Sequence, residues 1–235
     1  MKAALFDLDN TLYPETDFVR SGFSAVAEWL ATRFAADSAR SLGLMLDAMQ
    51  RDGRGRVFDT TLTQLGLGAR VPVELLLHVY RTHEPMISLA PEVRSMLERL
   101  RSEGVALGLV TDGASCVQHA KVAALGLGDL FEAIVCTDDL GPGHGKPSLV
   151  PFQIALGLLG CEPGESAYVA DDARKDFIAP NALGMCSVRV SQFLAGSFVP
   201  TVLITDIEPA GRPQHEVDRV CDLEALIVEK AEVGQ

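Results

Sequence analysis

The sequence predicts an α/β protein: a doubly wound, Rossmann-like parallel sheet with a small α-helical domain inserted into it. Two observations predict the sheet. Short, continuous apolar segments recur along the chain, and amphipathic stretches of helical period separate them. Strands covered by helices on both faces have continuous apolar runs, and their alternation with helices is typical of parallel sheets. A third observation, a long stretch with helical patterns and no strand, predicts the second domain.

The expected strands are short and rich in Val, Ile, Leu or Ala, and they cover residues 3–6, 105–110, 133–136, 167–170 and 187–190. Helical patterns lie between them at 92–103, 116–125 and 152–159, and a further helix is expected at 223–231. This alternation assigns residues 1–14 and 89–235 to the α/β core domain.

Residues 15–88 interrupt the alternation. They contain amphipathic stretches at 18–34 and 39–50. The sequence Leu-Gly-Leu-Gly at 65–68 is a helix stop, because Gly takes the left-handed conformation that ends a helix. An insertion after the first strand is the simplest organisation, so we expect a helical domain at residues 15–88.

Charge and cysteine usage limit the class of partner. The chain carries 20 Lys and Arg against 32 Asp and Glu, a formal net charge of -12. This charge repels nucleic acid and anionic lipid, and leaves a small anionic ligand as the expected partner. Five Cys without a Cys-x-x-Cys pair indicate reduced thiols. We expect a soluble, cytoplasmic protein, because there is no signal-peptide pattern and no apolar run of about 20 residues.

Polar residues follow the predicted strands at the edge where ligands bind in open α/β sheets. Carboxylates that converge there repel one another unless a cation lies among them. Oxygen ligands with room for water favour Mg²⁺ over zinc. The residues concerned follow the first, second and fourth strands, together with one lysine in a Gly-rich loop: Asp7, Asp9, Thr111, Asp112, Gly113, Asp171, Asp172 and Lys146.

These residues resemble the four motifs of the haloacid dehalogenase-like hydrolase superfamily. The segment 6–12, Phe-Asp-Leu-Asp-Asn-Thr-Leu, is similar to the first motif and includes Thr11. Each motif alone is weak, but all four occur in order across about 1–14 and 89–192. Ala170 departs from the Gly that the family often has before the fourth motif, with little expected effect. The second, third and fourth motifs are Thr111-Asp112-Gly113, Lys146-Pro147, and Asp171 with Asp172 and Asp176.

The resemblance implies phosphate removal from a small phosphorylated metabolite, a nucleotide or a sugar phosphate. Asp7 would attack phosphorus and form an aspartyl-phosphate, which divides one hard displacement into two easier ones. Asp9 would protonate the leaving oxygen and then deprotonate the hydrolytic water.

The resemblance identifies the helical domain at residues 15–88 as a cap domain, and it implies supporting roles around these two aspartates. Mg²⁺ would bind Asp7, the backbone carbonyl of Asp9, and Asp171. Phosphate oxygens would be held by Thr111, Lys146 and the backbone amides of Asp112 and Gly113. Thr11, Asp172 and Asp176 are expected to support the site, Asp176 by orienting Lys146 or metal-bound water. Asp172 could instead be only a helix cap.

Several alternatives stay open at this point. A phosphomutase would use the same pair of aspartates. A receiver-like phosphoacceptor would use an acid after the third strand, where this chain has Asp138 and Asp139, but receivers are about half as long and lack an insert. A silent binding protein is disfavoured by the intact acidic set, and a dehalogenase by Asp9 and the metal-binding acids. Three cations of the insert, Arg51, Arg54 and Arg56, could contact a second anionic group of the substrate. A solvated turn between helices is the favoured interpretation of this segment.

Overall fold

The computed structural model describes residues 1–194, 204–224, 226 and 227. The chain divides into two compact units, residues 1–14 with 88–235, and residues 15–87. We call them the core unit and the helical insert, and each is described by itself.

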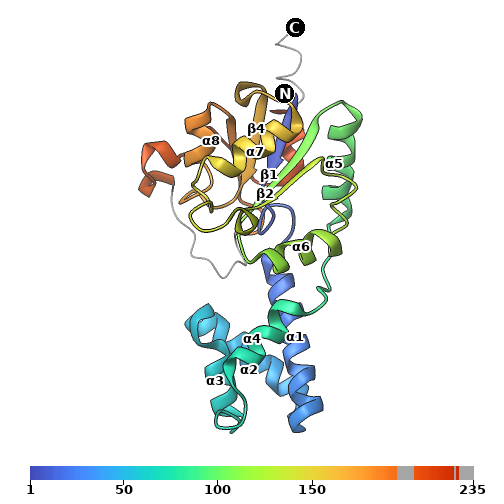
Figure 1. The fold of residues 1–235 in the computed structure, drawn as a ribbon, viewed down its shortest axis with the longest axis vertical. Coiled ribbons are helices and arrows are strands. Elements are labelled where there is room, and N and C mark those ends of the chain that lie inside the picture. The colour runs from blue at the N-terminus through green and yellow to red at the C-terminus, as the bar shows by residue number, and fades with distance from the viewer. Residues whose placement is uncertain (195–203, 225, 228–235) are drawn as a thin grey trace. The chain divides into compact units, whose positions relative to one another are not determined.

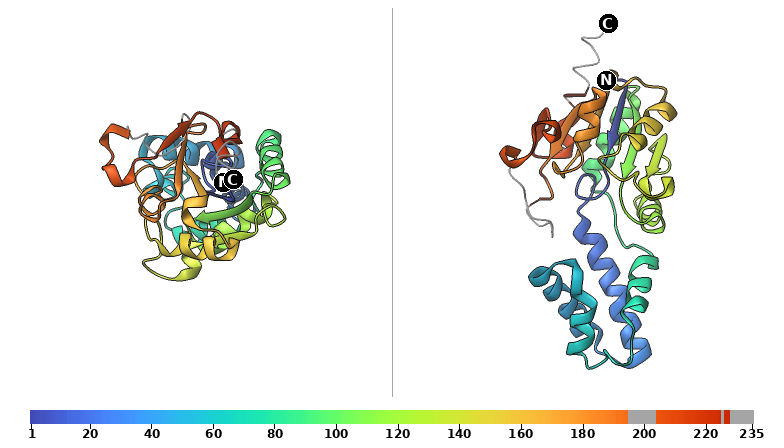
Figure 2. Two further views of the ribbon diagram at one scale, coloured as in Figure 1. Left: turned by 90° about the horizontal axis from the view of Figure 1, so that it is seen from above. Right: turned by 60° about the vertical axis from the view of Figure 1, so that its left-hand side comes forward.

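The core unit contains a six-stranded sheet in the order β3-β2-β1-β4-β5-β6, with all paired strands parallel. Figure 1 shows its strands, and Figure 2 shows β1, in dark blue, with later strands on both sides. This arrangement confirms the predicted doubly wound fold. The strands are β1 Ala3–Phe6, β2 Ala106–Thr111, β3 Ala133–Cys136, β4 Ser166–Ala170, β5 Cys186–Val190 and β6 His215–Val217.

Helices cover both faces of this sheet. On one face, α7 (Val150–Leu159) and α8 (Ile178–Leu183) pack over a buried cluster that includes Leu5 and Tyr168. Gly108 in β2 permits the close approach of α7, because a Cβ there would lie 3.1 Å from the Leu159 side chain. On the other face, Phe6 packs edge-on against Phe131. The remaining core helices are α5 Pro91–Ser102 and α6 Ser115–Ala124.

Several short elements complete the core unit. The strand β6 and the helix α8 have no counterpart among the predicted elements. Residues 223, 224, 226 and 227 are helical, and the rest of the helix expected at 223–231 lies outside the described residues. The 3₁₀ turns of the core are η2 Thr137–Leu140, η3 Pro163–Glu165, η4 Ile204–Asp206, η5 Pro209–Gly211 and η6 Val220–Asp222.

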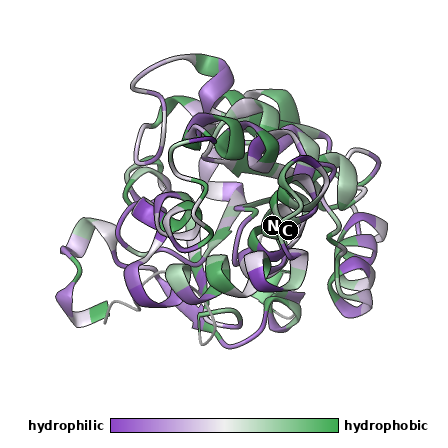
Figure 3. Cartoon of the chain, turned by 90° about the horizontal axis from the view of Figure 1, so that it is seen from below, coloured by the Kyte–Doolittle hydropathy of each residue, from purple (hydrophilic) through white to green (hydrophobic). Residues whose placement is uncertain are grey.

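The helical insert contains no strand among its residues, all of which the structure describes. Asp37 caps α2 (Ser38–Asp52) by accepting a hydrogen bond from the Arg40 amide at 2.8 Å. Figure 3, coloured by hydropathy, shows that helices carry both hydrophilic and hydrophobic residues, as amphipathic packing requires. The elements are α1 Glu15–Phe34, α2 Ser38–Asp52, η1 Arg54–Arg56, α3 Val57–Gln64 and α4 Val73–Thr82. Their aromatic core comprises Phe18, Phe23, Phe58 and Tyr80.

Candidate active site

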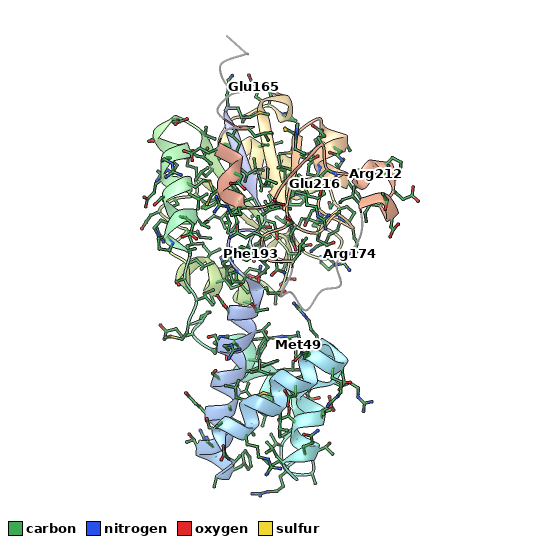
Figure 4. All side chains as sticks on the ribbon, turned by 180° about the vertical axis from the view of Figure 1, so that it is seen from behind. Met49, Glu165, Arg174, Phe193, Arg212 and Glu216 are labelled. Carbon is green, nitrogen blue, oxygen red and sulfur yellow. The ribbon has the colours of Figure 1, made fainter. Side chains whose placement is uncertain are left out.

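The candidate site lies at the carboxyl edge of the sheet, where β1 and β4 end side by side. Asp7 follows β1 and Asp171 follows β4, and these strands pair in the middle of the sheet. The chain proceeds from β1 through β2 to β3 on one side and continues with β4 to β6 on the other, so this is the point where strand order reverses. Figure 4 labels Glu165 before β4 and Arg174 beyond its other end, which marks this edge.

Lys146 lies at the centre of the site. Its side chain is fully buried, and its Nζ lies 2.5 Å from Asp7 Oδ1 and 2.8 Å from Asp176 Oδ1. It also donates a hydrogen bond to the Tyr168 hydroxyl at 3.1 Å. Burial alone would lower the pKa of Lys146, but Asp176 and Asp7 outweigh burial and raise it well above its ordinary value. Lys146 is therefore a fixed cation beside the expected nucleophile.

Three buried carboxylates surround this position. Asp7, Asp171 and Asp176 each bring an oxygen within 4.8 Å of the others. Burial raises the pKa of Asp7 to about 6, although Lys146 opposes the shift. Burial, then Asp7 and Asp176, raise the pKa of Asp171 to about 8. One lysine does not neutralise three acids, and a hard divalent cation with oxygen ligands fits the remaining charge.

Asp9 has a different environment from these three acids. Lys121 Nζ donates to both carboxylate oxygens of Asp9 at 2.8 Å. Tyr13 donates to Oδ1 at 2.5 Å and Gln118 to Oδ2 at 3.2 Å. Burial would raise the pKa of Asp9, but Lys121 and then the hydrogen bonds lower it below its ordinary value. The Asp9 side chain is thus held as a carboxylate by donors on α6 and the first loop. The Asp9 side chain therefore lies apart from the group of Asp7, Asp171 and Asp176.

The second-motif residues form one connected group. Thr111 is buried, and its Oγ1 accepts a hydrogen bond from Gln118 Nε2 at 2.6 Å. Gly113 has φ +132°, a backbone conformation that favours Gly, and a Cβ there would also crowd the Gln118 side chain at 3.1 Å. Asp112 accepts from the Lys146 backbone amide at 3.1 Å and from Lys175 Nζ at 3.0 Å. The Asp112 side chain thereby ties this motif to the loop of Lys146.

The remaining fourth-motif residues organise the loop after β4. Arg174 donates to both oxygens of Asp172 at 2.7 and 2.8 Å. Arg174 also donates its backbone amide to Asp172 Oδ1 at 3.1 Å, so this carboxylate bonds to its own loop. Asp176 accepts from the Asp172 backbone amide at 3.0 Å while it contacts Lys146. Thr11 is fully buried next to Asn10, whose φ of 57° turns the first-motif loop.

Sequence reasoning missed residues around the site, among them four that contact Asp9, Thr111 or Lys146. These four are Tyr13, Gln118, Lys121 and Tyr168. One signal could have found two of them. Gln118 and Lys121 are three positions apart, so they share a face of the helix that was expected at 116–125. Polar residues on the inward face of such a helix need buried partners.

Two of the three cations singled out in the insert, Arg51 and Arg54, have acidic partners. Arg51 pairs with Asp52, and Arg54 with Glu15. Arg54 and Arg81 also line a cavity of about 270 Å³ within the insert, together with Phe23 and Phe58.

Comparison with known families matches residues 1–184 to the haloacid dehalogenase-like hydrolases. The chain belongs to this family. The predicted family is therefore confirmed, and the chain is a hydrolase of the haloacid dehalogenase-like fold. In the described part of the chain, no helix combines the length and apolar character needed to cross a membrane.

The curated relatives include two sugar-phosphate phosphatases. A glyceraldehyde 3-phosphate phosphatase of Methanocaldococcus jannaschii is 29% identical, over 81% of this chain and 85% of that protein. A ribulose-1,5-bisphosphate 5-phosphatase of Halopiger xanaduensis is 27% identical, over 79% of this chain and 83% of that protein.

Solved structures share the fold. A 2-haloacid dehalogenase from Pseudomonas syringae superposes with a TM-score of 0.62, covering 98% of this chain and 99% of that one, at 23% identity. At this identity the likeness concerns the fold alone, so the residues of the site must decide the chemistry.

Proposed function

We propose that the chain is a Mg²⁺-dependent phosphomonoester hydrolase that acts on a small phosphorylated sugar through an aspartyl-phosphate on Asp7. The observation that carries the proposal is the group of Asp7, Asp171 and Asp176 around Lys146, with Asp9 separately held two residues after Asp7. A nucleophile, a cation and a separate proton acceptor are the parts that phosphoryl transfer through a covalent intermediate requires.

The metal site fits the residues present. Asp7 and Asp171 supply carboxylate oxygens, and burial, together with the neighbouring acids, raises the pKa of both groups. Together with the Asp9 backbone carbonyl they would hold Mg²⁺. When bound, Mg²⁺ would neutralise carboxylate and phosphate charge during the transfer. Asp176 is already paired with Lys146 at 2.8 Å, so we assign it to positioning Lys146.

The residues of the chain would carry out two steps. In the first, an Asp7 oxygen bonds to phosphorus while the bond to the leaving oxygen breaks, and Asp9 gives that oxygen a proton. In the second, Asp9 takes a proton from water, which attacks phosphorus and releases Asp7 and inorganic phosphate. Lys146 and Thr111 would hold the phosphate oxygens as charge spreads over them. The helical insert would act as a cap that selects the substrate.

The substrate class rests on relatives named as sugar-phosphate phosphatases, which include the two described above. A test is phosphate release from a panel of triose, pentose, hexose and nucleoside monophosphates, with Mg²⁺ and with EDTA. We expect Mg²⁺-dependent release, greatest for a sugar phosphate. If phosphate is released from none of these compounds, the proposal is contradicted.

Variants make this experiment specific. Asp7→Asn should lose turnover, whereas Asp129→Asn, an exposed aspartate in the same unit, should keep it. A phosphomutase would instead transfer phosphate to an added sugar acceptor, and chromatography of the products with and without the acceptor distinguishes the two outcomes.

A further inference from the structure

A second group of possible metal ligands lies outside the acidic site. Among the residues that the structure describes, His119, Cys136 and Asp139 bring an imidazole nitrogen, a thiol sulfur and a carboxylate oxygen within 4.8 Å of one another. They come from three consecutive parts of the core: α6, the end of β3 and η2. His119 Nε2 and Asp139 Oδ2 are already 2.8 Å apart.

The ligand types of this group differ from those of the acidic site. The group Asp7, Asp171 and Asp176 offers only oxygen, which suits Mg²⁺. A set of nitrogen, sulfur and oxygen suits a borderline cation, and zinc sites are built from these side chains. Cys136 is buried, whereas His119 and Asp139 are exposed. The sulfur would thus form the inner wall of the site, and the other two ligands would close it from the solvent side.

We propose that His119, Cys136 and Asp139 form a second metal site that binds Zn²⁺ or a cation of similar softness. Three protein ligands leave a fourth tetrahedral position for water or an exogenous ligand. The hydrogen bond between His119 and Asp139 is exchanged for two bonds to the metal, and the Cys136 proton is released to solvent. This proposal does not depend on the proposed phosphatase reaction.

The thiol of Cys136 adds a reason for metal selectivity. A metal binds the thiolate, so a cation must bind sulfur strongly to displace the proton of the thiol. Zn²⁺ and Co²⁺ do so, whereas Mg²⁺ prefers oxygen.

A metal at this position would connect α6 to the end of β3. His119 is on α6 between Gln118 and Lys121, the residues that hold Asp9. The α6 start is already tied to η2, because the Ser115 amide donates to Asp138 Oδ2 at 2.9 Å. A metal bonded to His119, Cys136 and Asp139 would add a second connection between α6 and the segment that contains the end of β3 and η2.

Co²⁺ is the probe for this site, because a cobalt–thiolate bond gives a near-ultraviolet charge-transfer band that carboxylate ligands do not give. The full chain is titrated with Co²⁺ in excess Mg²⁺, which occupies the all-oxygen site. We expect one equivalent of Co²⁺ to produce the band and added Zn²⁺ to abolish it. Absence of the band in the wild type would overturn the proposal.

Variants locate the sulfur and the nitrogen. Cys136→Ser should lose the band. Cys116→Ser should keep it, because Cys116 is an exposed thiol on α6, the helix of His119, and is outside the group. His119 is exposed, so His119→Ala leaves the core packing intact. The His119→Ala substitution should lower the affinity for Co²⁺ by more than the roughly 10–100-fold that loss of an outer-shell partner costs. A band that survives in Cys136→Ser, or unchanged Co²⁺ affinity in His119→Ala, would overturn the proposal.

Thermal unfolding gives an independent measurement. A ligand that binds only the folded state raises Tm. Zn²⁺ added in excess Mg²⁺ should raise the Tm of the wild type and of Cys116→Ser, and the rise should be smaller in His119→Ala. An equal rise in wild type and His119→Ala would place the zinc elsewhere and overturn the proposal.

Discussion

Lys121 donates to both carboxylate oxygens of Asp9 at 2.8 Å, and the Lys121 side chain is only 4% exposed. The pair stabilises the ionised form of Asp9 and lowers its pKa. In the proposed reaction the ionised form is the one that accepts a proton from water. The arrangement therefore matches the hydrolytic half of the reaction more closely than the first half, in which Asp9 must hold a proton.

The first prediction concerns this pair. Lys121→Met should lower the free energy of unfolding by about 3 kcal/mol at neutral pH, because it leaves a partly buried carboxylate, 19% exposed, without its cation. Since the folded-state pKa of Asp9 is lowered, the stability from its charge is present above the ordinary pKa of 3.8 and is lost as pH falls through the folded-state value. Urea unfolding measures the change. The double variant Asp9→Asn/Lys121→Met should recover part of it, and purely additive losses would contradict the coupling.

The second prediction concerns the crowded acids without metal. The folded-state pKa of Asp171, about 8, exceeds its ordinary value of 3.8, and that of Asp7 is raised to about 6. Between the ordinary and the raised values the folded state binds more protons than the unfolded state, so stability falls as pH rises through this window. In EDTA, urea midpoints should decrease with pH up to about 8, and Asp171→Asn should weaken the decrease. Midpoints that increase over this range would contradict the assignment.

The third prediction concerns the metal in the acidic site. Activity should require Mg²⁺ and be lost when Ca²⁺ replaces it, because Ca²⁺ takes more ligands at longer distances and would displace Asp7 from the phosphate. The measurement is the initial rate of phosphate release in EDTA, in Mg²⁺, and in Mg²⁺ with added Ca²⁺. Full activity in excess EDTA would remove the metal from the mechanism.

The parts of the site that were predictable from sequence are those that follow strands. Asp7 and Asp171 follow continuous buried segments, and parallel strands deliver such residues to one edge. Lys121 and Gln118 were not predicted. Their spacing shows that they share a face of the helix, but the sequence alone does not show that this face packs on the sheet. Their contacts with Asp9 depend on how α6 packs, which is a tertiary property.

The fold also contains elements that local sequence patterns do not predict. Strands of continuous apolar sequence were located to within one residue at each end. The strand β6 was missed because His215–Val217 has three residues, with a charged Glu216 in the middle. The helix α8 was missed because six residues with Pro180 among them are too few to show a period. Both are formed by pairing or packing with neighbours, and not by a local pattern.

The fourth prediction separates the two steps of the reaction. Asp9→Asn should slow the proton transfers by about 10²–10⁴-fold. A leaving group that needs no proton, such as p-nitrophenolate, should restore the first step but not the hydrolysis. We therefore expect a burst of about one equivalent of nitrophenol, followed by slow turnover.

The most direct test of the account is the intact mass of acid-quenched Asp9→Asn protein, taken during turnover of p-nitrophenyl phosphate with Mg²⁺. We predict a mass increase of one phosphoryl group, located on the peptide that contains Asp7 and absent from the double variant Asp7→Asn/Asp9→Asn. An unmodified mass, together with steady-state turnover at the wild-type rate, would contradict the covalent mechanism.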